Sequence, residues 1–251
     1  MIVAEWVMVF FASLRLPRRL QYGAGGIALL LFVGIAGISA TAVRAAIMAL
    51  IALFARATGR SYAASRALLF AVLLMLLWNP LYLCFDPGFS LSVAATAGII
   101  WFAPLIEIRL LRLRPFWRNA VATTLSAQLF VLPLLLYNIG LLSLVAVPAN
   151  LIVNPLVPFA MLFAAIAGLS GMVFGSIAPL IAKIIGLPAF LLTRFFIEVA
   201  QRGAGLPFAA FSLKQFPFVL VLLSYGVLAY IAFANRSSIT PQLRLAKNAS
   251  T

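Results

Sequence analysis

The sequence predicts an all-α membrane protein: a polytopic transmembrane helical bundle of about eight or nine passes, with some broken or re-entrant segments. The first observation is composition. Hydrophobic residues make up 65% of the 251 residues and charged residues only 9%, whereas soluble domains carry about 45–50% apolar and roughly 25% charged residues. A soluble globule of this length cannot bury so much apolar side chain. The second observation is that the apolar residues form continuous runs, without the alternation that lipid-facing strands require.

Charge-free stretches locate the expected spans, because a bilayer core about 30 Å thick needs roughly 20 apolar residues per helix. They cover residues 20–43, 67–85, 87–106, 119–182 and 215–235. The fourth stretch is long enough for about three spans at that length.

Glycine, asparagine and proline residues mark the expected breaks within that long stretch. These residues are Gly140, Asn150, Pro155 and Gly171. Two further segments, 45–59 and 180–196, can also span if their basic side chains extend to the membrane surface.

Positive charges predict the orientation of the first half of the chain. Arginines gather in three short segments, and the turns between these segments are nearly uncharged. The arginines are Arg15, Arg18 and Arg19, then Arg56, Arg60 and Arg66, then Arg109, Arg112, Arg114 and Arg118. The positive-inside rule places these segments in the cytoplasm. Beyond Ser143 the alternation is lost, so the topology there and the side of the C-terminal tail stay open.

The net charge of +14 is explained mostly by this topology and by attraction to anionic lipid, so membrane lipids are expected partners. The two ends of the chain are polar or short. Residues 1–14 are apolar but include Glu5 and are too few to span, which indicates part of a helix or an interfacial helix. The polar tail, residues 236–251, is expected to be disordered.

Composition also excludes several kinds of chemistry. The chain has no His and one Cys, Cys84, so it contains no Ser-His-Asp triad, no Cys–His pair, no His-based metal site and no intrachain disulfide. Four acidic residues are too few for a dedicated carboxylate cage around Mg²⁺ or Ca²⁺. We therefore expect no enzyme activity, no cofactor and no metal.

Polar side chains at membrane depth are costly and often functional, which makes them the first candidates for a transport pathway. Arg44 follows a turn of small residues, and Gln128 lies near the middle of an apolar stretch, five residues before Pro133. Asn150 and Asn154 lie among Pro148, Pro155 and Pro158, which should interrupt the helix. Interrupted helices at membrane depth persist where they are buried in protein or line a wet cavity. Hydrogen bonding between neighbouring helices is an equally open interpretation of the amides.

Asp86 is a further candidate, in the segment FDPGFSLS (Phe85–Ser92). The sequence predicts an outer turn that enters a helix, because Asp86 can cap the helix and Pro87 suits its first position. Structural capping is the favoured interpretation of Asp86.

Several motifs, taken in order, resemble the transmembrane domain of ComEC-type competence proteins, which act in DNA uptake. They are VRAAIMA (Val43–Ala49), WNPLYLCFDPGFSLSVAATAGI (Trp78–Ile99), Gln128 before LPLLLYNIGLLS (Leu132–Ser143), PANLIVNPLVP (Pro148–Pro158) and LPFAAFSLKQFPFVLVLLSYGVLAYI (Leu206–Ile231). The resemblance implies a competence-type transmembrane domain over residues 1–235.

The resemblance further implies a channel in the cytoplasmic membrane that passes single-stranded DNA into the cell during natural transformation. Arg44, Asp86, Gln128, Asn150 and Asn154 are then the candidate residues of the DNA pathway. Family members are typically longer, and many carry a metallo-β-lactamase-like domain after this region. We therefore expect a truncated or split family member, with other competence proteins or a separately encoded nuclease domain as possible partners. The oligomeric state stays open.

Two alternatives remain at this point. A small-molecule or lipid-linked transporter would use broken helices and intramembrane amides equally well. A truncated remnant of a family member would conduct nothing.

Overall fold

Ten α-helices, one short 3₁₀ helix and two short strands make up the described part of the computed structural model, which covers residues 18–35, 37, 39–143, 145–174, 179–206, 210–212 and 217–234. The expectations for residues 1–14 and 236–251 lie outside these residues. The helices in chain order are α2 (Arg18–Ile35), α3 (Ala40–Ala57), α4 (Ala64–Trp78), α5 (Tyr82–Phe85), α6 (Pro87–Arg109), α7 (Pro115–Asn138), α8 (Ala146–Val153), η1 (Asn154–Leu156), α9 (Val157–Phe174), α10 (Pro179–Ala204) and α11 (Phe218–Ala234).

Five helical segments are long and apolar enough to cross a membrane: α3, α6, α7, the continuous segment Ala146–Met172 and the segment Ala182–Ala204. Three further helices are also apolar but shorter: Leu20–Ile35, Ala64–Trp78 and Phe218–Ala232. The predicted all-α, polytopic membrane fold is confirmed.

Helix boundaries follow local chemistry where the sequence offers a cap or a flexible residue. The Ser39 hydroxyl accepts a hydrogen bond from the Ala42 backbone N–H (3.3 Å) and begins α3. Gly140 follows α7 with a φ of 70°, a conformation that favours glycine, and the chain leaves the helix there as predicted.

Two of the predicted breaks are wrong. Asn150 lies inside α8 and Gly171 inside α9. Since α9 continues to Phe174, the chain does not turn at Gly171.

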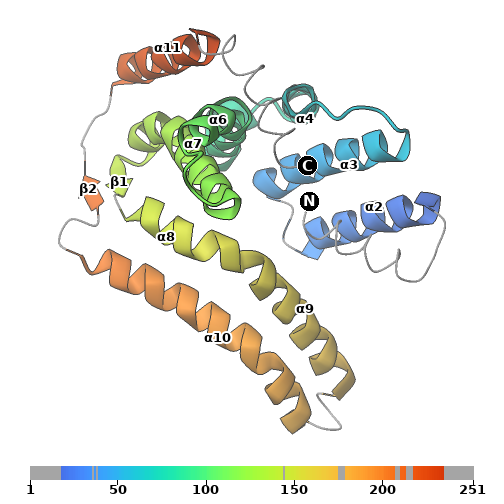
Figure 1. Ribbon diagram of the computed structural model, residues 1–251. Coiled ribbons are helices and arrows are strands. Elements are labelled where there is room, and N and C mark those ends of the chain that lie inside the picture. Colours follow the sequence, from blue (N-terminus) through green and yellow to red (C-terminus); the bar gives the residue numbers. More distant parts are fainter. Residues whose placement is uncertain are drawn as a thin grey trace.

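The prolines of residues 146–158 interrupt the helix less than predicted. Pro148 is the third residue of α8, Pro155 lies in η1 and Pro158 is the second residue of α9. A proline in the first turn of a helix breaks no hydrogen bond, because the first N–H groups have no partner within the helix. The result is a short 3₁₀ turn between two α-helices that follow one another in space (Figure 1).

The best-packed part of the bundle is the contact between α6 and α7, which lie together at the centre of Figure 1. Gly98 of α6 lies so close to α7 that an added Cβ would overlap the Ser126 carbonyl oxygen and the Phe130 side chain. The Phe130 and Phe102 rings meet edge to face, with centroids 5.0 Å apart. From α11, the Tyr225 hydroxyl donates to the Phe130 carbonyl oxygen at 2.6 Å.

Two short strands pair two linkers that lie far apart in the sequence. β1 (Leu141–Ser143) follows α7, and β2 (Ala210–Ser212) follows α10. They pair antiparallel, with Leu141 opposite Ser212.

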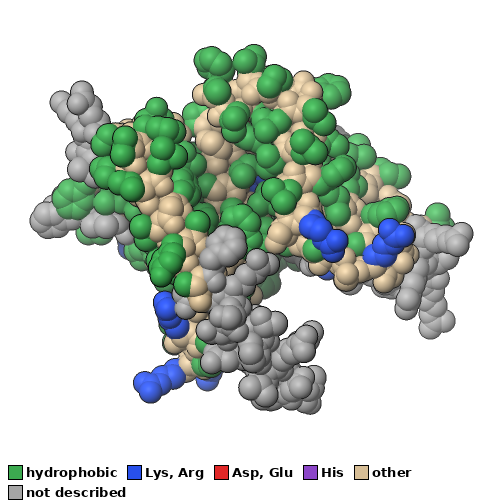
Figure 2. Space-filling model, turned by 90° about the horizontal axis from the view of Figure 1, so that it is seen from above, with side chains coloured by type: hydrophobic (Ala, Val, Ile, Leu, Met, Phe, Trp, Pro, Cys, Tyr) green, Lys and Arg blue, Asp and Glu red, His purple; other side chains and the backbone are tan. Residues whose placement is uncertain are grey.

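Between these strands, α9 and α10 form a long hairpin that projects from the rest of the bundle (Figure 1). In the most apolar 18-residue stretch of α10, no side chain is buried. Hydrophobic side chains also cover most of the face seen in Figure 2, with Lys and Arg side chains toward one side of the molecule. This distribution suits a protein surrounded by lipid.

Candidate functional site

Arg44 joins two of the sequence motifs that are far apart in the chain. It lies in the second turn of α3, half-buried against α6. Its Nε donates a hydrogen bond to the Ser92 hydroxyl at 2.8 Å. A terminal guanidinium nitrogen also lies 3.5 Å from the Met48 sulfur, one helical turn along α3. The motif VRAAIMA thereby contacts the motif FDPGFSLS.

The Arg44 contacts leave its charge uncompensated by any carboxylate among the described residues. A hydroxyl and a thioether are neutral, so the guanidinium keeps its full positive charge in partly buried surroundings. Such a group costs free energy in an apolar environment unless it meets an anion. Arg44 is therefore suited to bind a phosphate group transiently.

Asp86 lies at the same end of the bundle as Arg44. It is the N-cap of α6, where its Oδ1 accepts a hydrogen bond from the Phe89 backbone N–H at 3.0 Å. Ala40 of α3, Met75 of α4 and Phe89 of α6 pack together beside it. The predicted capping role is confirmed, and the structure shows no contact between Asp86 and Arg44.

Gln128 lies on α7, partly buried. No hydrogen-bond partner for its side-chain amide lies among the residues that the structure describes. Because α7 packs mainly on α6 and α11, Gln128 is not joined to Arg44 by any contact in this part of the chain.

Asn150 and Asn154 are exposed, on α8 and at the start of η1 respectively. Neither side chain is brought together with Arg44 or Asp86. The structure thus gathers Arg44 and Asp86 at one end of the bundle and leaves the three amides apart.

Ser92 is the residue that sequence reasoning missed. It lies in the motif FDPGFSLS but was not among the candidate pathway residues. It lies six residues into α6, as Arg44 lies five residues into α3, so each is about 7 Å from the start of its helix. A basic residue and a hydroxyl residue thus lie at nearly the same distance into two helices that each follow a turn. This spacing is the sequence signal that could have predicted their contact.

The described residues contain no group of three His, Cys, Asp or Glu side chains that could hold a metal ion. The arrangement at Arg44 offers a positive charge and a hydroxyl, which can bind an anion but provide neither a nucleophile paired with a base nor a metal ligand set.

The fold and this site define a multi-pass helical membrane protein with an unneutralised arginine between two helices. The chain belongs to the competence protein family, whose family model matches residues 1–237. It is also similar to ComE operon protein 3 of Bacillus subtilis (strain 168), with 29% identity over 138 residues. These findings confirm the resemblance to ComEC-type competence proteins.

The match to ComE operon protein 3 covers 55% of this chain but only 17% of that relative's length. No solved structure matches the chain.

Proposed function

We propose that the chain forms part of an inner-membrane channel that passes single-stranded DNA into the cell during natural transformation. It acts as a transport protein and not as an enzyme, and it needs no cofactor. Other competence proteins, including a separately encoded nuclease domain, are the proposed partners. Membership of the competence family and the set of membrane-spanning helices support this proposal.

The single observation that carries the proposal is the partly buried Arg44 guanidinium, held by the Ser92 hydroxyl and not by a carboxylate. A conducting site must attract phosphates and also release them, so a few separate positive charges suit it better than a tight cluster. Because Arg44 lies near the α3 and α6 N-termini, away from the arginine-rich loops, it would meet the strand at the outer side of the membrane.

The test is complementation of a deletion strain with variants of the chain. We expect Arg44→Gln to lower transformation frequency at least tenfold and Arg44→Lys to retain part of it, because charge matters more than the shape of the guanidinium. Ser92→Ala should have an intermediate effect, since it frees Arg44 to leave its position. The measurement is transformation frequency together with nuclease-resistant, strand-specifically labelled DNA in the cytoplasm.

The matched control is Arg112→Gln, which removes the same charge from an exposed loop. Equal losses in Arg44→Gln and Arg112→Gln, at equal protein levels, would contradict the role of Arg44. Normal uptake in the deletion strain itself would contradict DNA transport altogether, and would leave a small-molecule or lipid-linked transporter, or a remnant. Recovery of both labelled strands would contradict the single-strand claim alone.

A further inference from the structure

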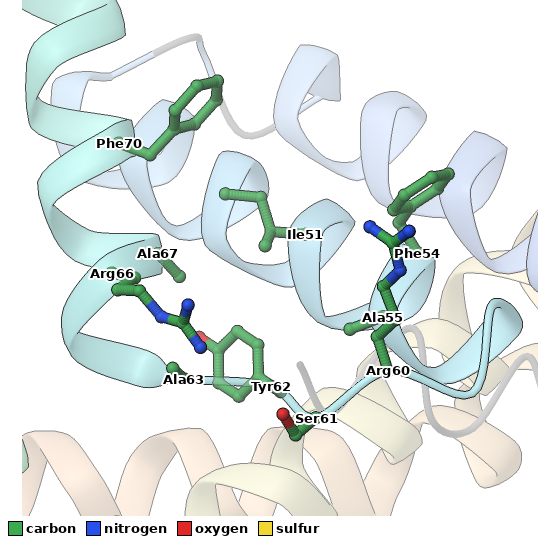
Figure 3. Close-up of a pocket in the computed structure, with 10 residues that line it drawn as sticks. All are labelled: Ile51, Phe54, Ala55, Arg60, Ser61, Tyr62, Ala63, Arg66, Ala67 and Phe70. Carbon is green, nitrogen blue, oxygen red and sulfur yellow. The ribbon is translucent and has the colours of Figure 1, made fainter.

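A cavity of about 590 Å³ lies where α3 ends and α4 begins, outside the Arg44 site. Figure 3 shows its lining: Arg60 and Arg66 stand at opposite sides, with the Tyr62 ring between them and Phe54 and Phe70 above. The volume is in the range of small-ligand sites, which run from about 300 to 1,000 Å³.

The polar half of the cavity is positive. Arg60 and Arg66 are both exposed, and no Asp or Glu lines the cavity. Ser61 adds a hydroxyl, and burial raises the pKa of Tyr62, so that its hydroxyl remains a neutral hydrogen-bond donor. These groups suit an anion such as a phosphate.

The N-terminus of α4 adds to the positive electrostatic potential of the cavity. Ala63 is the N-cap residue and offers no side-chain hydrogen bond to the first N–H groups of the helix. A helix N-terminus carries a partial positive charge and binds phosphate through these N–H groups. Ala63 lines the cavity, so the positive end of α4 faces the same space as the two arginines.

The other half of the cavity is apolar. Phe54 is 66% exposed and Phe70 is 53% exposed, each on an apolar helix on the membrane side of the loop. A free phosphate or a nucleic-acid backbone leaves such a wall without a partner. A phospholipid places its phosphate at the membrane surface and its acyl chains beside the helices, which matches both halves.

We propose that this cavity binds the headgroup of an anionic phospholipid, with Arg60 and Arg66 on the phosphate and Phe54 and Phe70 beside the first part of an acyl chain. Basic pockets between transmembrane helices commonly hold anionic headgroups. The site is separate from Arg44, and the proposal does not depend on DNA transport.

The test compares lipid retention by the full chain and a double variant, Arg60→Gln with Arg66→Gln. The proteins are purified from nanodiscs that contain phosphatidylglycerol and phosphatidylcholine, and bound lipids are counted by native mass spectrometry. A charge-assisted hydrogen bond from an arginine directly to the phosphate strengthens binding about tenfold, so the double variant should bind phosphatidylglycerol at least tenfold more weakly than the control. Its binding of phosphatidylcholine should not change.

The matched control is Arg109→Gln with Arg112→Gln, which removes two exposed charges from the end of α6 and the loop that follows it. An equal loss of phosphatidylglycerol in the control would overturn the proposal, because general charge and not the cavity would then hold the lipid. If the double variant fails to fold, the single variant Arg66→Gln, with Arg112→Gln as its control, makes the same comparison.

Two competitors separate the possible sources of phosphate. Full displacement of the lipid by millimolar inorganic phosphate would overturn the proposal in favour of a free-anion site. Displacement by a single-stranded oligonucleotide at micromolar concentration would overturn it in favour of a nucleic-acid site. Resistance to both, with weaker lipid retention in Phe54→Ala with Phe70→Ala, supports the lipid site.

Discussion

Single side chains decide which helices of this bundle stay together, because nearly every helix surface is apolar and lipid is an equally good neighbour. In a membrane, close packing at small residues and hydrogen bonds between helices provide the specificity. Gly98 provides the close packing between α6 and α7. Arg44 and Ser92 provide a hydrogen bond between α3 and α6.

Gly98→Ala should loosen the contact between α6 and α7. The added Cβ would overlap the Ser126 carbonyl oxygen, which belongs to the backbone and cannot turn aside, and it would lie 2.9 Å from the Phe130 Cβ. Overpacking of this kind costs roughly 1–3 kcal/mol. Thermal unfolding in detergent, followed by size-exclusion chromatography, measures the loss.

The control for that change is Gly168→Ala in α9, where an added Cβ meets nothing within 4 Å. Alanine favours the helix over glycine by about 1 kcal/mol, so this variant should be as stable as the parent or slightly more so. A larger loss in Gly168→Ala than in Gly98→Ala would contradict the packing argument.

Two substitutions at Asp86 distinguish the effect of its helix cap from the effect of its negative charge. Asp86→Ala removes the acceptor of the Phe89 N–H and should destabilise the protein by about 1 kcal/mol. Asp86→Asn keeps an acceptor and should unfold at nearly the parent temperature. If Asp86→Asn stops DNA uptake while the protein remains fully folded, the charge of Asp86 has a function beyond the cap.

Whole helices illustrate what a sequence of this kind can and cannot predict. The charge-free stretches predicted the positions of α2, α4, α6, α7 and α11, because length and the absence of charge are enough to define a span. The prolines of residues 146–158 interrupt the helix less than predicted, because the effect of a proline depends on its position within a helical turn, which composition does not reveal.

Contacts between helices were harder to predict than the helices. When all faces of a helix are apolar, no pattern says which face meets a partner. The Arg44–Ser92 hydrogen bond and the pairing of β1 with β2 therefore could not be predicted, although both ends of each contact lie in predicted motifs or linkers. Of the candidate site residues, Arg44 and Asp86 share one end of the bundle, and a role in the DNA pathway stays a prediction for these two as for Gln128, Asn150 and Asn154.

The attachment of α11 to the rest of the bundle provides a test at the level of a helix. Tyr225→Phe removes the hydroxyl that donates to the Phe130 carbonyl oxygen and keeps the ring. Hydrogen bonds between membrane helices contribute about 0.6 kcal/mol on average. The variant should unfold at a slightly lower temperature, and limited proteolysis should cut the linker before α11 sooner.

Tyr230→Phe, on the same helix, removes a hydroxyl from a residue that is 75% exposed. It should leave both the unfolding temperature and the rate of cutting unchanged. Equal effects of the two variants would show that the Phe130 contact does not hold α11.

The order of the helices extends the predicted orientation to the whole molecule. If each spanning segment crosses once, the arginine-rich loops lie inside, while the turns after α2, α4 and α7 lie outside. The linkers of β1 and β2 then lie on the same outer side, as their pairing requires. On the same condition, the loop that carries Arg60 and the proposed lipid cavity lies inside, where anionic lipids face the cytoplasm.

Cys84 makes this orientation testable without adding a label, because it is the only cysteine in the chain and is exposed. A membrane-impermeant maleimide should modify Cys84 in intact spheroplasts. In a Cys84→Ser background, Ser61→Cys places a cysteine of nearly equal size in the Arg60 loop, and it should react only after the membrane is opened. Reaction of Ser61→Cys from outside would reverse the orientation.

The pairing of β1 with β2 bears on how the protein is made. These strands flank the α8–α10 segment, so they can pair only after the ribosome has released α10 and the membrane has accepted the complete hairpin. Contacts between residues far apart in sequence form late, since the chain between them must first be ordered. The strand pair therefore forms only once α9 and α10 are in place, and a chain that fails to insert either helix keeps two unpaired strands.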